Sequence, residues 1–262
     1  MKRSLFIIFP LSLFLLQLSA KAAVQDNCKH LKIYEKCPYE DTDKCGKWAL
    51  EQKNKLCSDS EALNDYILKH LVSWDEKLKT LSFNFKQTMK FISADFVQES
   101  EGKLYYKKTK KQHLRLEQTK PERQIIWTDK KNIHIYQPRE NEKESQAICM
   151  QWDAWSAQQG SSYLGIVDFG NYAQTFKTNR VSRIDISSNE VIVTLKPKSK
   201  YENYKLILYL RAQDLFPVKI NLMLEDIDST VVLNKDTIKI NKKLSENIFN
   251  VNIPKKVTTL NL

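Results

Sequence analysis

The chain is poor in the residues and motifs on which many enzymes depend. Only five of its 262 residues are glycine and only four are histidine. The sequence contains no glycine-rich phosphate-binding loop and no G-x-S-x-G, H-E-x-x-H or C-x-x-C motif. No metal or cofactor is therefore expected. An enzyme, for example a hydrolase of lipid or glycan, would need a pair of carboxylates that only folding brings together.

The longest apolar stretch is too short to cross a membrane as a helix. It covers residues 5–18, follows a basic pair and precedes the small residues of Ala20-Lys21-Ala22. Because a membrane-spanning helix needs about 20 apolar residues, this pattern predicts a secretory signal peptide over residues 1–22, and the alternative is a retained N-terminal anchor. The residues before Cys28 are polar, which argues against lipid attachment there. We expect a soluble protein of the periplasm.

Positive charge is abundant but scattered. The formal net charge is +11, and loss of the signal peptide lowers it to +8. Basic runs are short, as in Lys107-Lys108 and Lys110-Lys111. An exported chain has little access to nucleic acid, so this excess favours a membrane surface or an acidic partner, unless the lysines only form a solvated face.

Four of the five cysteines lie close together near the N-terminus, at Cys28, Cys37, Cys45 and Cys57. In an exported protein this clustering indicates disulfides, and three pairings are possible. Nested bridges, Cys28–Cys57 and Cys37–Cys45, would suit a small helical hairpin over residues 23–59. A zinc site with His30 is the competing interpretation, but the usual close pairs of ligands are missing. We expect Cys149, the fifth cysteine, to be a buried or unpaired thiol.

Residues 60–262 carry the patterns of one mainly β domain. Ser58 and Glu61 form a plausible capping box, and apolar residues at spacings of three and four then predict a helix over 61–80. From Leu81 onward apolar and polar residues alternate with the period of half-buried strands, for example Phe83 and Phe85 with polar neighbours. An ordinary sandwich or barrel core would give the same alternation.

The order of the strands from Gly102 onward carries a resemblance. Predicted strands at 103–107, 114–118, 124–128 and 133–136 follow one another as a meander, with Pro121 in one turn. The succession of a glycine, a basic pair, a strand ending near proline, an apolar strand and an aromatic strand ending Tyr-x-Pro resembles the periplasmic outer-membrane lipoprotein carrier family, LolA. The resemblance covers about residues 61–258. It implies an α+β, mainly antiparallel, open half-barrel sheet covered by lid helices.

The resemblance also implies an apolar hollow for acyl chains. Our candidates for its lining, assigned to one face of each strand by pattern with an uncertainty of one register, are Leu104, Leu114, Leu116, Ile125, Trp127, Ile133, Ile135, Val193, Leu195, Leu206, Leu208, Leu222 and Leu224. The candidate lid lies within residues 151–167, and its apolar face is expected to comprise Trp152, Trp155, Tyr163, Leu164 and Ile166.

The sequence departs from the family pattern at the lid and at the N-terminus. Where the family has Arg-Pro, with an arginine that helps hold the lid shut, this chain has Lys108-Thr109. Lys108 is therefore the expected latch, without the planar fork of arginine. Ser162 replaces a proline common before the last lid helix, and the four-cysteine head has no counterpart in the family pattern.

The function that the resemblance implies is transport of acylated lipoproteins from the inner to the outer membrane. The expected partners are acylated lipoproteins or lipids, an inner-membrane lipoprotein-releasing complex and an outer-membrane acceptor. Nucleic acid is not expected as a partner, and the protein is expected to be a monomer. A sensor or binding module of the same fold, which holds lipid or peptide without shuttling it, is the alternative.

Overall fold

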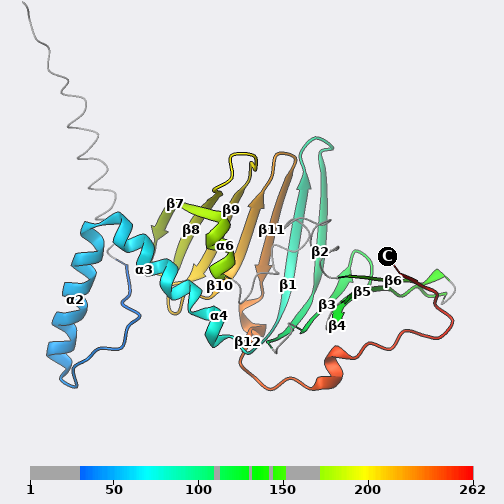
Figure 1. Cartoon of the computed structure of the whole chain (residues 1–262), viewed down its shortest axis with the longest axis horizontal. Helices are drawn as coiled ribbons and strands as arrows, with labels where there is room; N and C mark the ends of the chain where they lie inside the picture. Colours follow the sequence, from blue (N-terminus) through cyan, green and yellow to red (C-terminus); the bar gives the residue numbers. More distant parts are fainter. Residues whose placement is uncertain (1–29, 109–112, 130–131, 142–143, 152–171, 262) are drawn as a thin grey trace, which may run out of the picture.

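Thirteen strands in the described part of the chain form one mostly antiparallel sheet that does not close into a barrel (Figure 1). The computed structural model describes residues 30–108, 113–129, 132–141, 144–151 and 172–261. The strand order is β13-β6-β5-β4-β3-β2-β1-β11-β10-β9-β8-β7, and β12 pairs with β1 outside this path. The first half of the sheet is a meander that begins at the central strand β1. The second half returns to β1 through β11.

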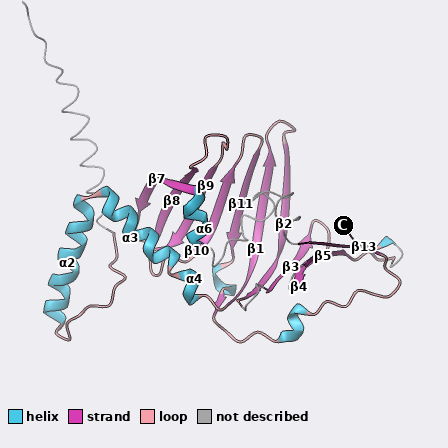
Figure 2. Cartoon of the chain, in the orientation of Figure 1, coloured by secondary structure: helices cyan, strands magenta, loops and turns pink. Residues whose placement is uncertain are grey.

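The strand bounds are β1 Thr80–Phe91, β2 Phe96–Lys107, β3 His113–Lys120, β4 Gln124–Asp129, β5 Asn132–Gln137, β6 Gln146–Gln151, β7 Asn179–Ile186, β8 Glu190–Pro197, β9 Lys205–Arg211, β10 Pro217–Met223, β11 Ile227–Leu233, β12 Lys239–Ile240 and β13 Thr259–Asn261. The helices are α2 Thr42–Ser58, α3 Ser60–Val72, α4 Trp74–Lys77, α6 Tyr172–Thr178, and the 3-10 turns η3 Lys235–Thr237 and η4 Glu246–Phe249. The predicted meander is confirmed by β2 to β5. Mostly antiparallel strands with few helices also confirm the expected fold class (Figure 2).

Alternation in the sequence explains the face that each strand buries. Along β1, Phe83 and Phe85 are buried whereas Asn84 and Lys86 are exposed. Because successive side chains of a strand point to opposite faces, one face of β1 collects the aromatic rings. Gly102 on β2 lies against the Phe85 ring, and a Cβ at this position would lie 2.4 Å from the carbonyl oxygen of Glu117. Only glycine fits at this position, because the Phe85 ring of β1 and the Glu117 carbonyl of β3 leave no room for a side chain.

Helix α3 begins one residue before the predicted range of 61–80 and ends well before its end. Its N-cap is Asp59, whose carboxylate accepts hydrogen bonds from the backbone N–H groups of Glu61 and Ala62 at 2.9 and 3.2 Å. Ser58 does not cap this helix, because its hydroxyl donates to the Lys55 carbonyl in the preceding one. The helix ends at Val72, since the chain turns there into α4 and enters β1 at Thr80. The expected helix over 61–80 is therefore two helices and a strand entry.

The head contains one helix in its described residues, not the expected hairpin of two. Residues 30–41 form no helix, and α2 follows them, capped by Asp41. A disulfide joins Cys37 to Cys45. Cys57 is also a disulfide cysteine, and Cys28, its expected partner, lies outside the described residues. Helix α2 has no fully buried residue, and it contacts the main apolar cluster through Leu56 and Cys57 near its C-terminal end, which are partly buried.

Helices α3, α4 and α6 lie in front of the half of the sheet that β7 to β10 form (Figures 1 and 2). Ile67 and Leu71 of α3 are completely buried and belong to the same apolar cluster as Phe83 and Val193 of the sheet. We call the face that these helices cover the inner face. Within the described residues, no helix is long and apolar enough to cross a membrane.

The C-terminal segment, residues 241–261, covers part of the opposite face, which we call the outer face. It leaves β12, forms η4 and ends as β13, which pairs in parallel with β6. Val257 of this segment is buried against side chains of β4, β5 and β6 in a second, separate apolar cluster. The sheet therefore has a cover on each face.

Candidate functional site

A continuous row of apolar side chains crosses six strands on the inner face. Cross-strand register places its members opposite one another in the order Phe83, Leu104, Leu116, Ile126, Ile135 and Ile148. The first four are buried and the last two are partly buried against the same cluster. Directly opposed side chains on one face are close enough to pack on each other. The row forms one apolar surface across half the sheet.

A second row lies beside the first and contains two polar groups. Leu81, Tyr106 and Leu114 oppose one another, and Ile133 opposes Met150. Thr128 links these sets, because its hydroxyl accepts a hydrogen bond from the Leu114 N–H at 2.9 Å. The Tyr106 hydroxyl is buried and has no hydrogen-bond partner among the residues that the structure describes. Burial raises the pKa of Tyr106, with a smaller contribution from the charge of Asp75.

The other half of the sheet continues the apolar inner face. Ile220, Leu208 and Val193 oppose one another across β10, β9 and β8, and so do Leu222, Leu206 and Leu195. Val193 and Leu195 are completely buried. Leu224 differs from the other candidates because it lies beyond the end of β10, in the turn to β11, and is half-buried.

Two of the candidate lining residues lie on the outer face, which corrects their expected position. Ile125 and Trp127 pack with Val257 in the outer cluster, whereas Ile126 between them lies in the inner row. Trp127 also stacks on His134, with ring centroids 4.8 Å apart. The pattern was ambiguous because β4 reads Ile-Ile-Trp and is apolar on both faces. A shift of β4 by one residue would exchange its two faces. The pairing of β4 with β3 decides that Ile126, and not Ile125 or Trp127, lies on the inner face.

Sequence reasoning missed Ile126, Phe83 and Tyr106 as members of the inner surface. Phe83 could have been found from its alternation with Asn84 in the first strand. Ile126 could have been found only by pairing, since Ile126 opposes Leu116 and so shares its face. Tyr106 sits two residues from Leu104 on β2, and the period of a strand already places both on one face.

The expected latch, Lys108, contacts helix α4. Its ammonium group donates a hydrogen bond to the backbone carbonyl of Asp75, and its backbone N–H donates to the carbonyl of Lys79. The Asp75 carboxylate in turn accepts hydrogen bonds from the N–H groups of Tyr172 and Ala173, at 2.7 and 2.8 Å. Asp75 therefore ties the end of β2 and the start of α6 to one turn of α4. The expected lid residues Trp152, Trp155, Tyr163, Leu164 and Ile166 lie outside the described residues.

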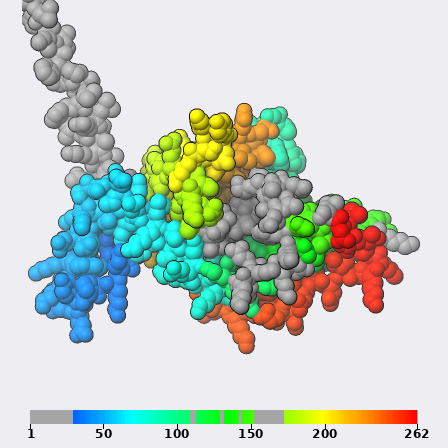
Figure 3. Space-filling view, viewed as in Figure 1, coloured from blue at the N-terminus to red at the C-terminus, as the bar shows by residue number. Residues whose placement is uncertain are grey.

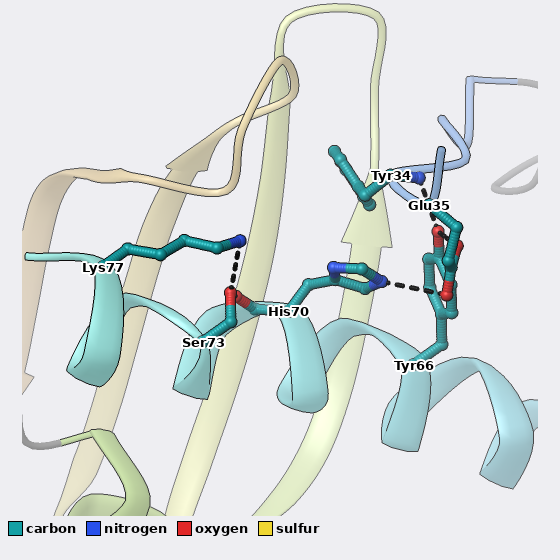
Figure 4. Close-up of polar contacts among 6 residues, drawn as sticks. All are labelled: Tyr34, Glu35, Tyr66, His70, Ser73 and Lys77. Carbon is teal, nitrogen blue, oxygen red and sulfur yellow. Dashed lines mark hydrogen bonds and ion pairs between the residues drawn. The ribbon is translucent and has the colours of Figure 1, made fainter. Parts of the chain in front are cut away.

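A cluster of aromatic and charged groups fastens the head to α3 (Figure 4). The Tyr66 hydroxyl donates to a Glu35 carboxylate oxygen and accepts from the Tyr34 N–H, both at 2.6 Å. His70 Nε2 lies 3.2 Å from the other Glu35 oxygen, and the Tyr34 hydroxyl donates to the Ala212 carbonyl. We call Tyr34, Glu35, Tyr66 and His70 the head clasp. It joins the head, α3 and the sheet.

The pKa values of the head clasp follow from these contacts. Partial burial acts to raise the pKa of Glu35, but hydrogen bonds from Tyr66 and His70 outweigh it and lower the pKa below its ordinary value. Burial, and then the charge of Asp214, raises the pKa of Tyr34 to about 12. Burial and the hydrogen bond to Glu35 raise the pKa of Tyr66. The arrangement favours an ionised Glu35 with both phenols protonated.

The described residues offer little for catalysis. No group of three or more histidine, cysteine, aspartate or glutamate side chains among them could hold a metal ion. Cys149 is half-buried on β6, opposite His134 of β5 in the strand register. The strongest polar cluster, the head clasp, serves to attach one segment to another. The inner face is lined mainly by apolar side chains.

Comparison with solved structures finds similar chains at low sequence identity. MucB is 14% identical, with a TM-score of 0.48 over 74% of this chain and 64% of MucB, so the match spans less than two thirds of that protein. A LolA superfamily protein from Nitrosomonas europaea is 12% identical, with a TM-score of 0.39 over 71% and 96% of the two chains. The lipoprotein LppX from Mycobacterium tuberculosis is 7% identical, with a TM-score of 0.38 over 68% and 95%. Comparison with curated protein sequences finds no significant match.

An unclosed antiparallel sheet with an apolar inner face under helices defines the LolA-like class of protein. The family model described as outer membrane lipoprotein carrier protein LolA matches residues 76–252, which is more than half of the chain. The chain belongs to the LolA family. The match begins within α4 and ends after η4, so the head lies outside it.

Proposed function

We propose that this protein is a periplasmic carrier that binds the acyl chains of lipoproteins on its inner face and shuttles them from the inner to the outer membrane. The observation that carries the proposal is the row from Phe83 to Ile148, an apolar surface on the face that helices cover. Membership of a family of lipoprotein carriers supports it. No catalysis is required for this role.

Release of cargo is the physical difficulty that such a carrier has to solve. Burial of an acyl chain contributes about 0.8 kcal/mol per methylene, so one sixteen-carbon chain could contribute roughly 12 kcal/mol. A rigid, well-fitted pocket would hold that chain too tightly. The cost of moving a cover must therefore offset much of this free energy. Helices joined by a few polar contacts suit such a cover better than a second sheet would.

The contacts of Asp75 support a latch that holds this cover in place. Asp75 bonds to Lys108 and to the first residues of α6, and α6 directly follows residues 152–171. We propose that the lid residues Trp152, Trp155, Tyr163, Leu164 and Ile166 close over the inner face and that Asp75 and Lys108 hold this closed state. The Tyr106 hydroxyl, buried nearby on β2, would offer a hydrogen bond to a polar group of the cargo.

In this role the protein would accept cargo from an inner-membrane lipoprotein-releasing complex and pass it to an outer-membrane acceptor. The test that separates a carrier from a sensor of the same fold is transfer. A loaded carrier gives its lipopeptide to acceptor vesicles or to an acceptor protein, whereas a sensor retains it. Lipopeptide that stays bound while an acceptor is present in excess would contradict the shuttling role.

Photo-crosslinking tests the binding surface without any substitution. A fatty acid with a diazirine on its chain, bound and irradiated, should label the inner-face residues Leu116 and Ile126. The adjacent residues Ile125 and Trp127 on the outer face are the matched control within one strand. Labelling of Ile125, Trp127 or Val257 in place of the inner row would overturn the proposal, and so would the absence of saturable labelling.

A further inference from the structure

Three hairpin turns lie side by side at one end of the strands, along a rim of the sheet that we call the three-hairpin edge. They are the β1–β2 turn at 92–95, the β10–β11 turn at 224–226 and the β8–β9 turn at 198–204. Strand register places them at the same edge, because Phe91 opposes both Phe96 and Ile227, and Met223 at the end of β10 opposes Lys205 at the start of β9. In Figures 1 and 3 the three turns stand along the upper rim as adjoining teal, orange and yellow features.

An open pocket of about 570 Å³ lies at this edge between β7, β8, β9 and β10. Its lining is strongly basic, with two carboxylates, Glu202 and Glu225, against five cationic side chains: Arg180, Lys196, Lys198, Lys200 and Lys205. None of the five is within ion-pair distance of an acidic group among the described residues. Lys198 donates to the Phe176 carbonyl at the end of α6. The pocket therefore has an uncompensated charge of +3.

The positions of two of these cations are unfavourable for the isolated sheet. Arg180 and Lys196 lie directly opposite each other on neighbouring strands. Like charges in this arrangement repel and destabilise the pair. An anion bound between them would remove the repulsion, and a basic pocket with few acids attracts such a ligand.

Apolar side chains are exposed at the same edge. Ile92, Phe96 and Val97 at the β1–β2 turn are 50, 53 and 51% exposed, and Tyr201 in the β8–β9 turn is 90% exposed. Phe96 stacks on Phe91, with ring centroids 5.8 Å apart. Aromatic and aliphatic residues beside basic ones are typical of surfaces that enter the interfacial layer of a membrane.

The turn that carries these apolar side chains is held in place by its neighbour. The backbone N–H of Ile92 donates to the Asp226 carbonyl at 2.9 Å, and the N–H of Ser93 donates to the Asp226 carboxylate at 2.8 Å. Asp226 belongs to the β10–β11 turn, so two of the three turns form one unit. Hydrogen bonds from Ser93 lower the pKa of Asp226, which favours the ionised carboxylate that accepts them.

We propose that the three-hairpin edge docks on an anionic membrane surface. The basic pocket binds the phosphate of a lipid headgroup, and the β1–β2 turn places Phe96 and its neighbours in the interfacial layer. The proposed docking depends only on the residues of this edge and does not require acyl binding on the inner face. An acidic protein would satisfy the pocket charge, but it would not by itself account for the exposed aromatic side chains in two separate turns.

Sedimentation with vesicles tests the proposal. The purified protein is mixed with phosphatidylcholine vesicles that contain or lack phosphatidylglycerol. The pocket variant replaces Arg180, Lys196 and Lys200 with glutamine. Its matched control replaces Lys47, Lys69 and Lys243, which are exposed elsewhere, and so has the same net charge. We expect saturable binding to the anionic vesicles only, at least tenfold weaker for the pocket variant and within about twofold of the parent for the control.

A second pair of variants tests the apolar turn. Phe96→Ser should weaken binding several-fold, whereas Leu50→Ser, at an exposed apolar position of α2, should leave it unchanged. Circular dichroism establishes that each variant is folded. Equal loss for the pocket and control variants would show that net charge alone drives binding, and this outcome would overturn the assigned site. Failure of the parent to bind anionic vesicles would overturn membrane docking and favour an acidic protein partner at the same pocket.

Discussion

The two covers of the sheet differ in how they are attached. The inner cover consists of helices that pack apolar side chains against the sheet but are tied at their ends by polar contacts, at Asp75 and at the head clasp. The outer cover is a strap that packs Val257 against the sheet and ends in a strand paired with β6. Strand pairing and packing together fix the outer cover. The inner cover is also held by packing, since Ile67 and Leu71 of α3 are completely buried, but within the described residues its ends are tied by hydrogen bonds and not by strand pairing.

Deletion of residues 246–262 should have the largest effect, because it removes most of the outer cover, including η4 and β13. Phe249 and Val257 are buried there, and full burial of such side chains contributes about 1.5–3 kcal/mol each. We expect a loss of roughly 3–6 kcal/mol in the free energy of unfolding, measured by urea denaturation. Amide hydrogen exchange should rise in β4 to β6 and stay unchanged in β8 to β10. Equal loosening of both halves would contradict the separation of the two covers.

Neighbouring residues of β4 offer a more refined comparison of the two faces. Ile125→Ala and Ile126→Ala each remove a buried side chain, and such changes cost about 2–5 kcal/mol of unfolding free energy. Stability should therefore fall to a similar extent in both variants. Only Ile126→Ala should alter the affinity for a fluorescent fatty acid, as measured by titration. A change in affinity for Ile125→Ala alone would reverse our assignment of the faces.

Alternation predicted the strands well because each has a face of its own to bury. The meander from β2 to β5 follows from Leu104, Leu114 and Leu116 and from the turn at Pro121. The faces of β4 did not follow, because the strap that buries Ile125 and Trp127 comes from a segment more than 120 residues away. The periodicity of a strand cannot predict which of its two faces such a distant segment will cover.

The sequence pattern also failed to predict the N-cap of α3 and the basic pocket. The sequence pattern predicted Ser58 as the cap of α3, whereas its neighbour Asp59 caps the helix. The cations around the pocket come from three strands and the β8–β9 turn. Their separation in sequence made them look like a scattered, solvated charge. Lys108 was selected as a latch by resemblance alone, and its contact with a backbone carbonyl is one that a lysine can make.

The latch should affect release more than stability. Asp75→Ala removes the acceptor of two N–H groups of α6, and loss of a hydrogen bond to a charged group costs about 1.5–3 kcal/mol. We expect a faster dissociation of bound fatty acid, measured by stopped-flow displacement, with β4 to β6 unchanged in hydrogen exchange. Lys108→Met should have the same direction of effect, since its ammonium donates to the Asp75 carbonyl. Slower dissociation in either variant would remove the latch from the mechanism.

The head clasp should give the smallest effect, and pH is the variable that reveals it. The pKa of Glu35 is lowered in the folded protein by hydrogen bonds from Tyr66 and His70, against the opposing effect of burial. A carboxyl group with a lowered pKa contributes stability above its unfolded value of about 4.3, and this contribution is lost as the pH falls through the folded pKa. Because Glu35 is 39% exposed, we expect less than about 1 kcal/mol.

Protection of the Tyr34 amide measures this contribution directly, since its N–H donates to the Tyr66 hydroxyl. Protection factors, corrected for the intrinsic exchange rate, should be constant from pH 7 to about pH 5 and should decrease below that. Tyr66→Phe removes both hydrogen bonds of the hydroxyl and should abolish this pH dependence. Tyr39→Phe in the exposed part of the head is the matched control and should retain it. A Tyr34 amide whose protection is independent of pH in the parent protein would mean that Glu35 does not hold the head on α3, and the inner cover would then depend on Asp75 and on apolar packing alone.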